Sequence, residues 1–262
     1  MIPNVVQMIW IGRHFPYVNR LAVESVLLAD PETVVRIHYA DPPENEQWQA
    51  LQRLERVEFI PIDFEKLLEP WKSAPKILQQ VDQMAASYLA GRSNILRYLI
   101  LYLEGGVYLD FDILMLRPFG DLLEERGFIG EELVFRADDE RVQRAPFRIG
   151  MTWEYPAFLF SWGITRFNSY FCRNSRPLNA LSELAAKIWG IKKLNNAVLG
   201  AEPEHPFFRR AIEAIPERDP TIQYGMGPIL MNQIWSERDW SGEMRRMESK
   251  AFYAVPPSQT HR

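Results

Sequence analysis

The chain has 262 residues, of which 47% are hydrophobic and 13% aromatic, so it is long enough to bury a full core as one continuous α/β domain. A formal net charge of −4 and the lack of a Lys/Arg-rich block exclude the basic surface typical of nucleic-acid-binding proteins. The single cysteine, Cys172, excludes a disulfide framework within these residues and a cysteine-rich zinc site. We expect Cys172 to be a reduced thiol in the core.

The first sixty residues alternate between short apolar segments and longer helix-like segments. Apolar segments bounded by Gly, Pro and Asp predict strands, and the segments between them predict helices. This order predicts a parallel sheet with helices on its faces. The expected strands are 5–11, 34–40 and 57–62, and the expected helices are 18–29 and 44–56.

A helical region expected over 75–103 ends at Gly105-Gly106 and leads into a strand expected over 107–116, which carries Asp110 and Asp112. Side chains alternate along a strand, so the two carboxylates should project to the same side. Neighbouring carboxylates repel each other unless a cation lies beside them, and a hard divalent cation with oxygen ligands is the usual one. Such a cation commonly binds a diphosphate on its other side.

The pattern is less regular after residue 118. We expect strands joined by loops over 133–160, helices over 177–189, 206–214 and 228–236, and a last strand over 251–255. The first residues lack the basic flank of a signal peptide, and no apolar run is long enough to cross a membrane. We therefore expect a soluble, cytoplasmic protein, with peripheral membrane contact through exposed aromatic side chains as the alternative.

Asn94 and Arg97 are three residues apart on a predicted helix and so share one of its faces. Because this helix leads into the strand with the two aspartates, Arg97 is placed to donate to sugar hydroxyls or phosphate oxygens. The alternative is an ion pair from Arg97 to Glu104 or Asp110 that only joins helix to strand. Trp10, at the end of the first strand, is either a core residue or an aromatic face for a base.

Residues 93–112, SNILRYLILYLEGGVYLDFD, resemble the sugar-nucleotide-binding segment of glycosyltransferases with a DXD motif. That family includes yeast α-mannosyltransferases, vertebrate α1,4-galactosyltransferases and, more distantly, the clostridial glucosylating toxins. The resemblance extends to residues 2–3 and 9–12, and more weakly to 196–197, 205–207 and 227–228, so it spans most of the chain.

The resemblance implies a GT-A fold, with a Rossmann-like, mostly parallel sheet flanked by helices and a less regular acceptor-side region. One catalytic domain would cover 1–262, with a nucleotide-sugar-binding half at 1–118 and an acceptor-side half at 119–262. The implied activity is metal-dependent transfer of a sugar from a nucleotide-diphosphate sugar, a UDP-sugar in preference to a GDP-sugar, to a hydroxyl of a glycan, lipid or protein acceptor. Retention of the anomeric configuration is also implied, as is Mn²⁺ or Mg²⁺ as cofactor.

Individual residues acquire roles from the same resemblance. Trp10 would stack on the base, and Ser93 and Asn94 would lie near the base and ribose. Gly105 and Gly106 would allow a sharp turn and a close approach of the backbone. The other nucleotide-sugar-binding residues would be Ile11, Gly12, Arg97, Tyr108, Asp110 and Asn196.

The implied catalytic residues are Arg97, Asp110 and Asp112. Arg97 would hold the transferred sugar or the phosphates, and Tyr108 would contact the diphosphate. Asp110 would bind ribose and sugar hydroxyls, whereas Asp112 would ligate the cation, with Asp110 beside it. Asn196 would contact the sugar or the acceptor.

This chain departs from the family pattern at four places. Gln7 stands where the family usually has His, and Asn94 where it has Asp, which removes a negative charge beside the sugar. Met231-Asn232 replaces Leu-Thr. His261 is the candidate for a further metal ligand near the C-terminal end, and a solvated tail histidine is its alternative.

Two rival functions fit parts of the sequence. A haloacid-dehalogenase-like phosphotransferase also places Asp-x-Asp after an apolar strand, although early in its chain and with a downstream acidic and lysine partner. A sugar-nucleotide-binding protein with little or no turnover would be consistent with Asn94 in place of aspartate.

Overall fold

The computed structural model describes residues 1–84, 89–135, 190–222 and 224–252. The chain forms two compact units. One unit comprises Met1–Ile129 and Asn196–Arg246, and the other comprises Gly130–Asn195 and Met247–Arg262. Within the described residues seven strands form one sheet, in the order β3 (Val57–Pro61), β2 (Val34–Tyr39), β1 (Val5–Trp10), β4 (Gly106–Leu109), β6 (Gly190–Ala201), β5 (Gly127–Phe135) and β7 (Arg245–Met247).

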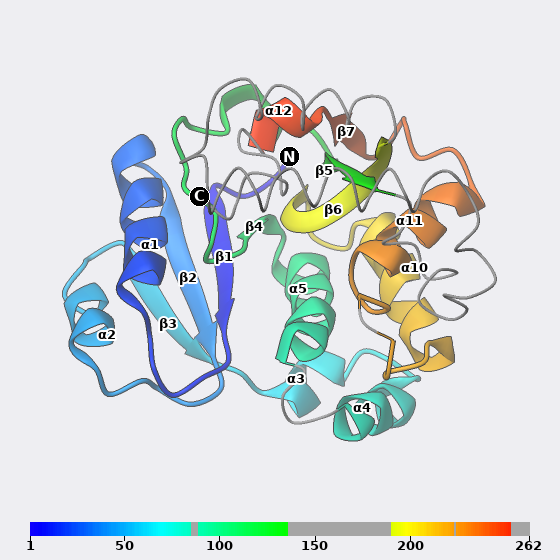
Figure 1. Ribbon diagram of the computed structural model, residues 1–262, viewed down its shortest axis with the longest axis horizontal. Helices are drawn as coiled ribbons and strands as arrows, with labels where there is room; N and C mark the ends of the chain where they lie inside the picture. The colour runs from blue at the N-terminus through cyan, green and yellow to red at the C-terminus, as the bar shows by residue number, and fades with distance from the viewer. Residues whose placement is uncertain (85–88, 136–189, 223, 253–262) are drawn as a thin grey trace, which may run out of the picture. The chain divides into compact units, whose positions relative to one another are not determined.

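The first unit opens with the predicted alternation of strands and helices (Figure 1). Strands β1 and β2 pair in parallel, as do β2 and β3, which confirms the predicted parallel sheet. Helix α2 is shorter than the predicted 44–56. The side chain of Asn45 accepts the backbone N–H of Trp48 and starts the helix there, and the helix ends at Leu51. The elements are β1 (Val5–Trp10), α1 (Tyr17–Ala29), β2 (Val34–Tyr39), α2 (Glu46–Leu51) and β3 (Val57–Pro61).

The predicted helical region of 75–103 is two helices, α4 (Ala74–Gln83) and α5 (Leu89–Glu104). A short helix that the sequence did not predict, α3 (Phe64–Leu68), precedes them and is capped by Asp63, whose side chain accepts the N–H of Lys66. Helix α5 carries apolar residues on most of its faces and is largely buried, as expected of a helix without a polar stripe.

Two glycines connect α5 to β4 (Gly106–Leu109). Gly105 has φ +66° and Gly106 has φ +98°, in the left-handed region that favours glycine. A Cβ at Gly106 would lie 2.6 Å from the carbonyl oxygen of Val5. The pair therefore permits both the sharp turn and the close packing of β4 against β1.

The strand predicted over 107–116 is wrong in its extent, since β4 ends at Leu109. The backbone N–H of Asp110 still donates to the carbonyl of Ala197, at 3.0 Å, but the chain then turns. The N–H of Ile113 donates to the carbonyl of Asp110 at 3.1 Å and closes this turn around Asp112. The two aspartates thus follow a buried strand, and alternation along a strand is not what brings them together.

Strand β4 lies between two neighbours of opposite direction. It pairs in parallel with β1 and antiparallel with β6 (Gly190–Ala201), with Leu109 opposite Val198. The sequence did not predict β6, because Lys192-Lys193 and Asn195-Asn196 interrupt its apolar pattern. The remaining described elements of the sheet are β5 (Gly127–Phe135) and β7 (Arg245–Met247).

The predicted helix 206–214 is confirmed as α10 (Pro206–Ala214), and 228–236 as α11 (Pro228–Glu237). The predicted last strand is wrong at its start, because residues 251 and 252 belong to helix α12 (Ser249–Phe252). Residues 136–160, the helix 177–189, Cys172 and residues 253–255 lie outside the described residues. Short 3₁₀ helices occur at Gly120–Glu124 and Ile215–Glu217.

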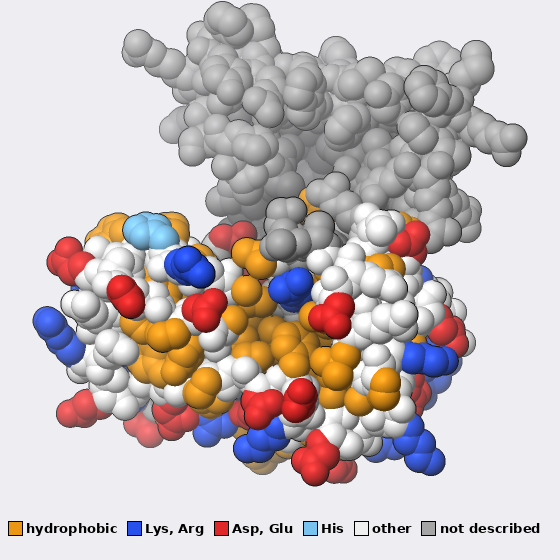
Figure 2. Space-filling view, turned by 90° about the horizontal axis from the view of Figure 1, so that it is seen from below, with side chains coloured by type: hydrophobic (Ala, Val, Ile, Leu, Met, Phe, Trp, Pro, Cys, Tyr) orange, Lys and Arg blue, Asp and Glu red, His pale blue; other side chains and the backbone are white. Residues whose placement is uncertain are grey.

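Within the described residues no helix has the length and apolar character needed to cross a membrane. The face of the molecule in Figure 2 carries hydrophobic side chains among charges of both signs. The two signs are interspersed in this view, so this face is not the single-sign basic surface that nucleic acid would require.

Candidate functional site

Asp110 and Arg97 form a charged pair between the end of β4 and helix α5. The Nη2 of Arg97 donates to Oδ1 of Asp110 at 3.0 Å, and the hydroxyl of Tyr108 donates to the same oxygen at 2.6 Å. Of the two ion pairs considered for Arg97, the one to Asp110 is present, whereas Glu104 pairs with Arg36. Both described donors use Oδ1, which leaves Oδ2 of Asp110 for a ligand.

Arg97 is almost completely buried, with 5% of its side chain exposed. Its guanidinium lies 4.2 Å from the centre of the Tyr108 ring, and Nη1 donates to the backbone carbonyl of Asn196. Burial lowers the pKa of Arg97, but the charge and hydrogen bond of Asp110 together with Tyr108 and Tyr98 raise it by more, so the pKa is raised overall. Among the described residues, none accepts a hydrogen bond from its Nε. Arg97 is thus a fixed cation whose Nε–H has no acceptor among the described residues.

Tyr108 is buried, and burial is the main reason that its pKa lies well above the usual range. It therefore stays protonated and can donate to Asp110 at any physiological pH. In this arrangement the tyrosine hydroxyl orients the carboxylate.

Asp112 is exposed, two residues beyond Asp110. Partial desolvation and the charge of Asp110 raise the pKa of Asp112, so the two carboxylates are close enough to repel each other. Arg97 lowers this pKa but forms its ion pair with Asp110. Asp112 therefore lacks a side-chain cation of its own among the described residues.

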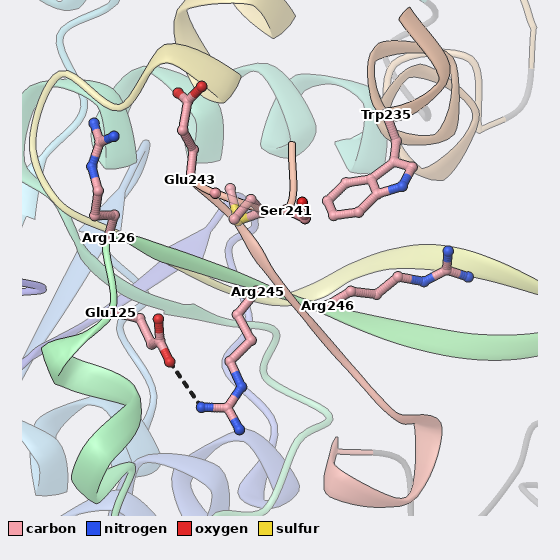
Figure 3. Close-up of a pocket in the computed structure, with 9 residues that line it drawn as sticks. Glu125, Arg126, Trp235, Ser241, Glu243, Arg245 and Arg246 are labelled. Carbon is pink, nitrogen blue, oxygen red and sulfur yellow. Dashed lines mark hydrogen bonds and ion pairs between the residues drawn. The ribbon is translucent and has the colours of Figure 1, made fainter. Parts of the chain in front are cut away.

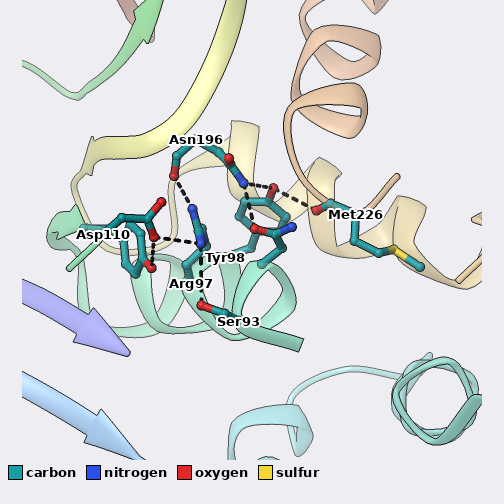
Figure 4. A network of polar contacts seen from close by, with 8 residues as sticks. Ser93, Arg97, Tyr98, Asp110, Asn196 and Met226 are labelled. Atoms are coloured by element: carbon teal, nitrogen blue, oxygen red, sulfur yellow. Dashed lines mark hydrogen bonds and ion pairs between the residues drawn. The ribbon is translucent and has the colours of Figure 1, made fainter. Parts of the chain in front are cut away.

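Four polar groups from α5, β6 and the segment before α11 form a hydrogen-bonded series, which we call the amide ladder (Figure 4). The hydroxyl of Tyr98 donates to the carbonyl of Met226 at 2.9 Å. The Nδ2 of Asn196 donates to the hydroxyl of Tyr98 at 3.3 Å and to Oδ1 of Asn94 at 2.9 Å. Both asparagines are 6% exposed.

Trp10 lies at the end of β1 and is partly exposed. Its ring meets the rings of Phe15 and Phe111 edge-on, with centroids 5.0 and 5.6 Å apart, and its Nε1 donates to the carbonyl of Gly12 at 2.9 Å. Ile11, which lies between Trp10 and Gly12 in the sequence, is also partly exposed. Trp10 therefore packs on the core and keeps part of its surface accessible, and its stacking on a base stays a prediction.

Ser93 lies one helical turn before Arg97, whose Nη2 is 3.5 Å from the Ser93 hydroxyl. Arg97 thus connects Asp110 to Ser93 and to the backbone of Asn196, whose side chain in turn binds Asn94. Figure 4 shows Arg97 between Asp110, Ser93 and Asn196. His261 lies outside the described residues, so its role as a metal ligand stays a prediction. No group of three or more His, Cys, Asp or Glu side chains gathers at a possible metal site in the described part of the chain.

Gln7, at the family's histidine position, is buried beneath the Gly105-Gly106 turn. Its Nε2 donates to the carbonyl of Gly105 at 3.2 Å, which leaves its Oε1 to accept from Nε2 of His38 at 2.7 Å. Burial, with a smaller contribution from Arg36, lowers the pKa of His38 to about 4. This neutral pair supports the turn from inside the sheet.

Sequence reasoning missed Tyr98 and the strand that carries Asn196. Tyr98 follows Arg97 within an apolar run, which made it indistinguishable from a core residue. A signal for the strand was available: Leu194, Asn196 and Val198 are buried at alternate positions, and an asparagine at such a position needs a polar partner.

A cavity of about 360 Å³ lies between α11 and β7, away from the Asp110 cluster (Figure 3). Arg245 pairs with Glu125 at 2.8 Å, and Arg126 with Glu202 at 2.7 Å. Each of these charges is compensated at the surface, in contrast to Asp112.

Residues 31–129 match the family described as "Glycosyltransferase sugar-binding region containing DXD motif". This match covers less than half of the chain. A curated relative, Glucan organizing enzyme 1 of Cryptococcus neoformans var. grubii serotype A, is 26% identical over 123 residues, which are 46% of this chain and 29% of that protein. The match thus spans less than a third of that protein's length.

Two solved structures have the same fold as this chain. PaToxG Glycosyltransferase has a TM-score of 0.51 and 16% identity, and the match covers 90% of this chain and 68% of that one. The ligand-free glycosyltransferase domain of the YGT toxin has a TM-score of 0.51 and 10% identity, with 94% and 80% coverage. The predicted GT-A fold is confirmed.

Proposed function

We propose that this chain is a metal-dependent transferase that moves a sugar from a nucleotide-diphosphate sugar to an acceptor hydroxyl, with retention of the anomeric configuration. UDP-sugars are the favoured donors and GDP-sugars the alternative. The observation that carries the proposal is the contrast between two neighbouring carboxylates: Asp110 is held by Arg97 and Tyr108, whereas Asp112 is exposed and has no paired cation among the described residues.

A hard divalent cation fits these two carboxylates. Their mutual repulsion, which raises the pKa of Asp112, is relieved when a cation lies beside them. Asp112 and Oδ2 of Asp110 would hold Mn²⁺ or Mg²⁺, and water and donor phosphates would complete the oxygen ligands. The bound cation would neutralise charge on the diphosphate leaving group.

The chain's own residues would bind and orient the donor. Trp10 would offer its accessible surface to the base, while Ser93 and Asn94 would lie beside the ribose and sugar. Arg97 stays cationic at every physiological pH and would place its charge beside the diphosphate. Residues 1–118 would form the donor half and 119–262 the acceptor half, with Asn196 joining the donor half through Arg97.

In the proposed reaction, the bond between the anomeric carbon and the diphosphate oxygen breaks, and both electrons leave with the diphosphate. The acceptor oxygen forms the new bond on the same face of the sugar, and its proton passes to the departing phosphate. Arg97 favours this step because negative charge on the phosphate grows as the bond breaks.

The test is donor hydrolysis and binding with purified protein. A panel of UDP- and GDP-sugars is screened by thermal shift with Mn²⁺, and donors that stabilise the protein are assayed for release of the nucleoside diphosphate. We expect Asp112→Ala to lose about 100-fold or more of this activity. Asp121→Ala is the matched control, because Asp121 is an exposed aspartate a few residues away.

Equal turnover by the wild type and Asp112→Ala would contradict the proposed role of Asp112 as a metal ligand. Stabilisation by sugar nucleotides without any consumption, with or without an added acceptor panel, would favour the binding protein that lacks turnover.

A further inference from the structure

Asn94 can face a ligand with either end of its amide, and the two ends have opposite hydrogen-bonding character. An NH₂ group donates, whereas a carbonyl oxygen or the carboxylate of an aspartate only accepts. The amide ladder determines which end is turned away from the ligand.

The direction of each hydrogen bond follows from the backbone carbonyl of Met226. A carbonyl can only accept, so the hydrogen of the Tyr98 hydroxyl points to it. The oxygen of Tyr98 is then an acceptor for Asn196, which must present its NH₂ to that side. The second hydrogen of this NH₂ goes to Asn94, which must turn its Oδ1 inward.

Asn94 therefore presents its NH₂ on the other side. Among the described residues none accepts from this nitrogen, although Asn94 is only 6% exposed. Gly227 leaves the space beside it: a Cβ there would lie 2.6 Å from Nδ2 of Asn94 and 3.1 Å from Nδ2 of Asn196. Since no described residue accepts from this donor, it is available to a ligand or to water.

The location connects this donor to the proposed donor site. Asn94 lies one helical turn before Arg97 on α5, and Arg97 binds both Asp110 and the backbone of Asn196. The amide ladder and the charged pair are thus one continuous polar cluster.

We propose that Asn94 offers a hydrogen-bond donor to the transferred sugar, and that Tyr98, acting through Asn196, is the positioning residue that fixes this polarity. The inference rests on the proposed function. The sugar group that meets Asn94 must accept: a hydroxyl through its lone pair, a carbonyl or a carboxylate. An aspartate at this position would instead require a hydroxyl that donates.

Deoxyfluoro sugars test the polarity, because fluorine accepts weakly but never donates. The probes are the sugar nucleotide that binds the wild type best in the donor panel and its analogues with fluorine in place of each sugar hydroxyl in turn. Dissociation constants are measured with Mn²⁺ by calorimetry at pH 7.5, since fluorine also slows the chemical step. The quantity compared is the ratio of the constants for the fluoro analogue and its parent.

We expect Asn94→Asp to raise this ratio by about 10- to 100-fold at one ring position, because a carboxylate repels fluorine and loses the donated hydroxyl. This variant keeps the acceptor for Asn196, so the ladder can remain intact. Tyr98→Phe should raise the ratio less, since Asn196 can then adopt either orientation. Tyr102→Phe is the control: it removes a hydroxyl from the same helix that binds Arg209 instead of the ladder, and should leave the ratio unchanged.

Three results would overturn the inference. If the parent sugar nucleotide does not bind the wild type, the proposed function fails and the inference with it. If the parent binds but Asn94→Asp leaves the ratio unchanged at every position, Asn94 does not select polarity, whereas the proposed function stands. If only Asn94→Asp changes the ratio, Tyr98 is not the positioning residue.

Discussion

Two ion pairs of nearly equal length lie in the first unit of this protein and differ in their surroundings. Arg97 and Asp110 are 3.0 Å apart with 5% and 32% of their side chains exposed, whereas Arg245 and Glu125 are 2.8 Å apart with 52% and 37% exposed. Water screens the second pair and makes either partner dispensable. Burial deprives Arg97 of water, so Asp110 is needed to stabilise its charge. The Oδ2 of Asp110 stays available to a ligand.

The difference shows why bond length alone is a poor guide to a functional site. The cavity beside β7 has three arginines on its lining, but the described ion pairs of Arg126 and Arg245 are surface pairs. The Asp110 cluster has fewer charges, yet Oδ2 of Asp110, Nε of Arg97 and Nδ2 of Asn94 have no partner among the described residues. Unmet hydrogen-bonding capacity in a buried cluster points to a ligand.

The largest expected effect comes from removing Arg97, with removal of Arg245 as the comparison. Arg97→Met should lower the free energy of unfolding by about 3 kcal/mol, because it leaves the Asp110 carboxylate without its cation, and should abolish sugar-nucleotide binding. Arg245→Met should change the stability by less than about 1 kcal/mol. Urea unfolding of both variants measures the difference, and similar losses would remove the distinction between the two pairs.

A pH titration extends the comparison to a buried group that carries no charge. His38 is 3% exposed with a pKa of about 4, below the ordinary 6.5, so between these pH values the unfolded chain binds a proton that the folded chain does not. Stability should therefore fall as the pH decreases from about 6.5 to 4, by up to about 3 kcal/mol, with no further loss from this group at lower pH.

The contribution of His38 is isolated with His38→Gln, which keeps a donor for Gln7 but cannot titrate. Urea unfolding at several pH values should show a steeper dependence for the wild type than for this variant between pH 6.5 and 4. Parallel curves would mean that His38 does not titrate abnormally.

A smaller effect tests whether the two aspartates interact. Asp110→Asn removes the neighbouring negative charge that raises the pKa of Asp112, so that pKa should fall, although the desolvation that contributes most remains. Carbon-13 NMR titration of the Asp112 carboxyl in the metal-free protein measures the change. An unchanged or higher pKa would mean that the two carboxylates are too far apart to share a cation.

The smallest effect concerns the surface pair. A double-mutant cycle on Arg245 and Glu125 should give a coupling energy of about 0.2 to 1 kcal/mol, and 1 M salt should reduce it. A coupling above about 2 kcal/mol that salt leaves unchanged would place this pair in the same class as Arg97 and Asp110.

Much of the fold follows from local signals in the sequence. The alternation of apolar segments predicted β1, α1, β2 and β3, because each element buries an apolar face of its own period. The glycine pair predicted the turn before β4, since only glycine readily adopts positive φ values there. The DXD-type region and the pairing of Arg97 with Asp110 were likewise accessible from spacing and resemblance.

Other features depend on contacts between distant segments. The end of β4 at Leu109 is set by a turn around Asp112, and β6 forms despite its lysines and asparagines because β4 offers it an edge. The orientation of the Asn94 amide depends on Met226, which follows it by more than a hundred residues. Sequence alone thus determined which polar groups are present, whereas tertiary structure decided which of their hydrogen bonds are satisfied and which remain for a ligand.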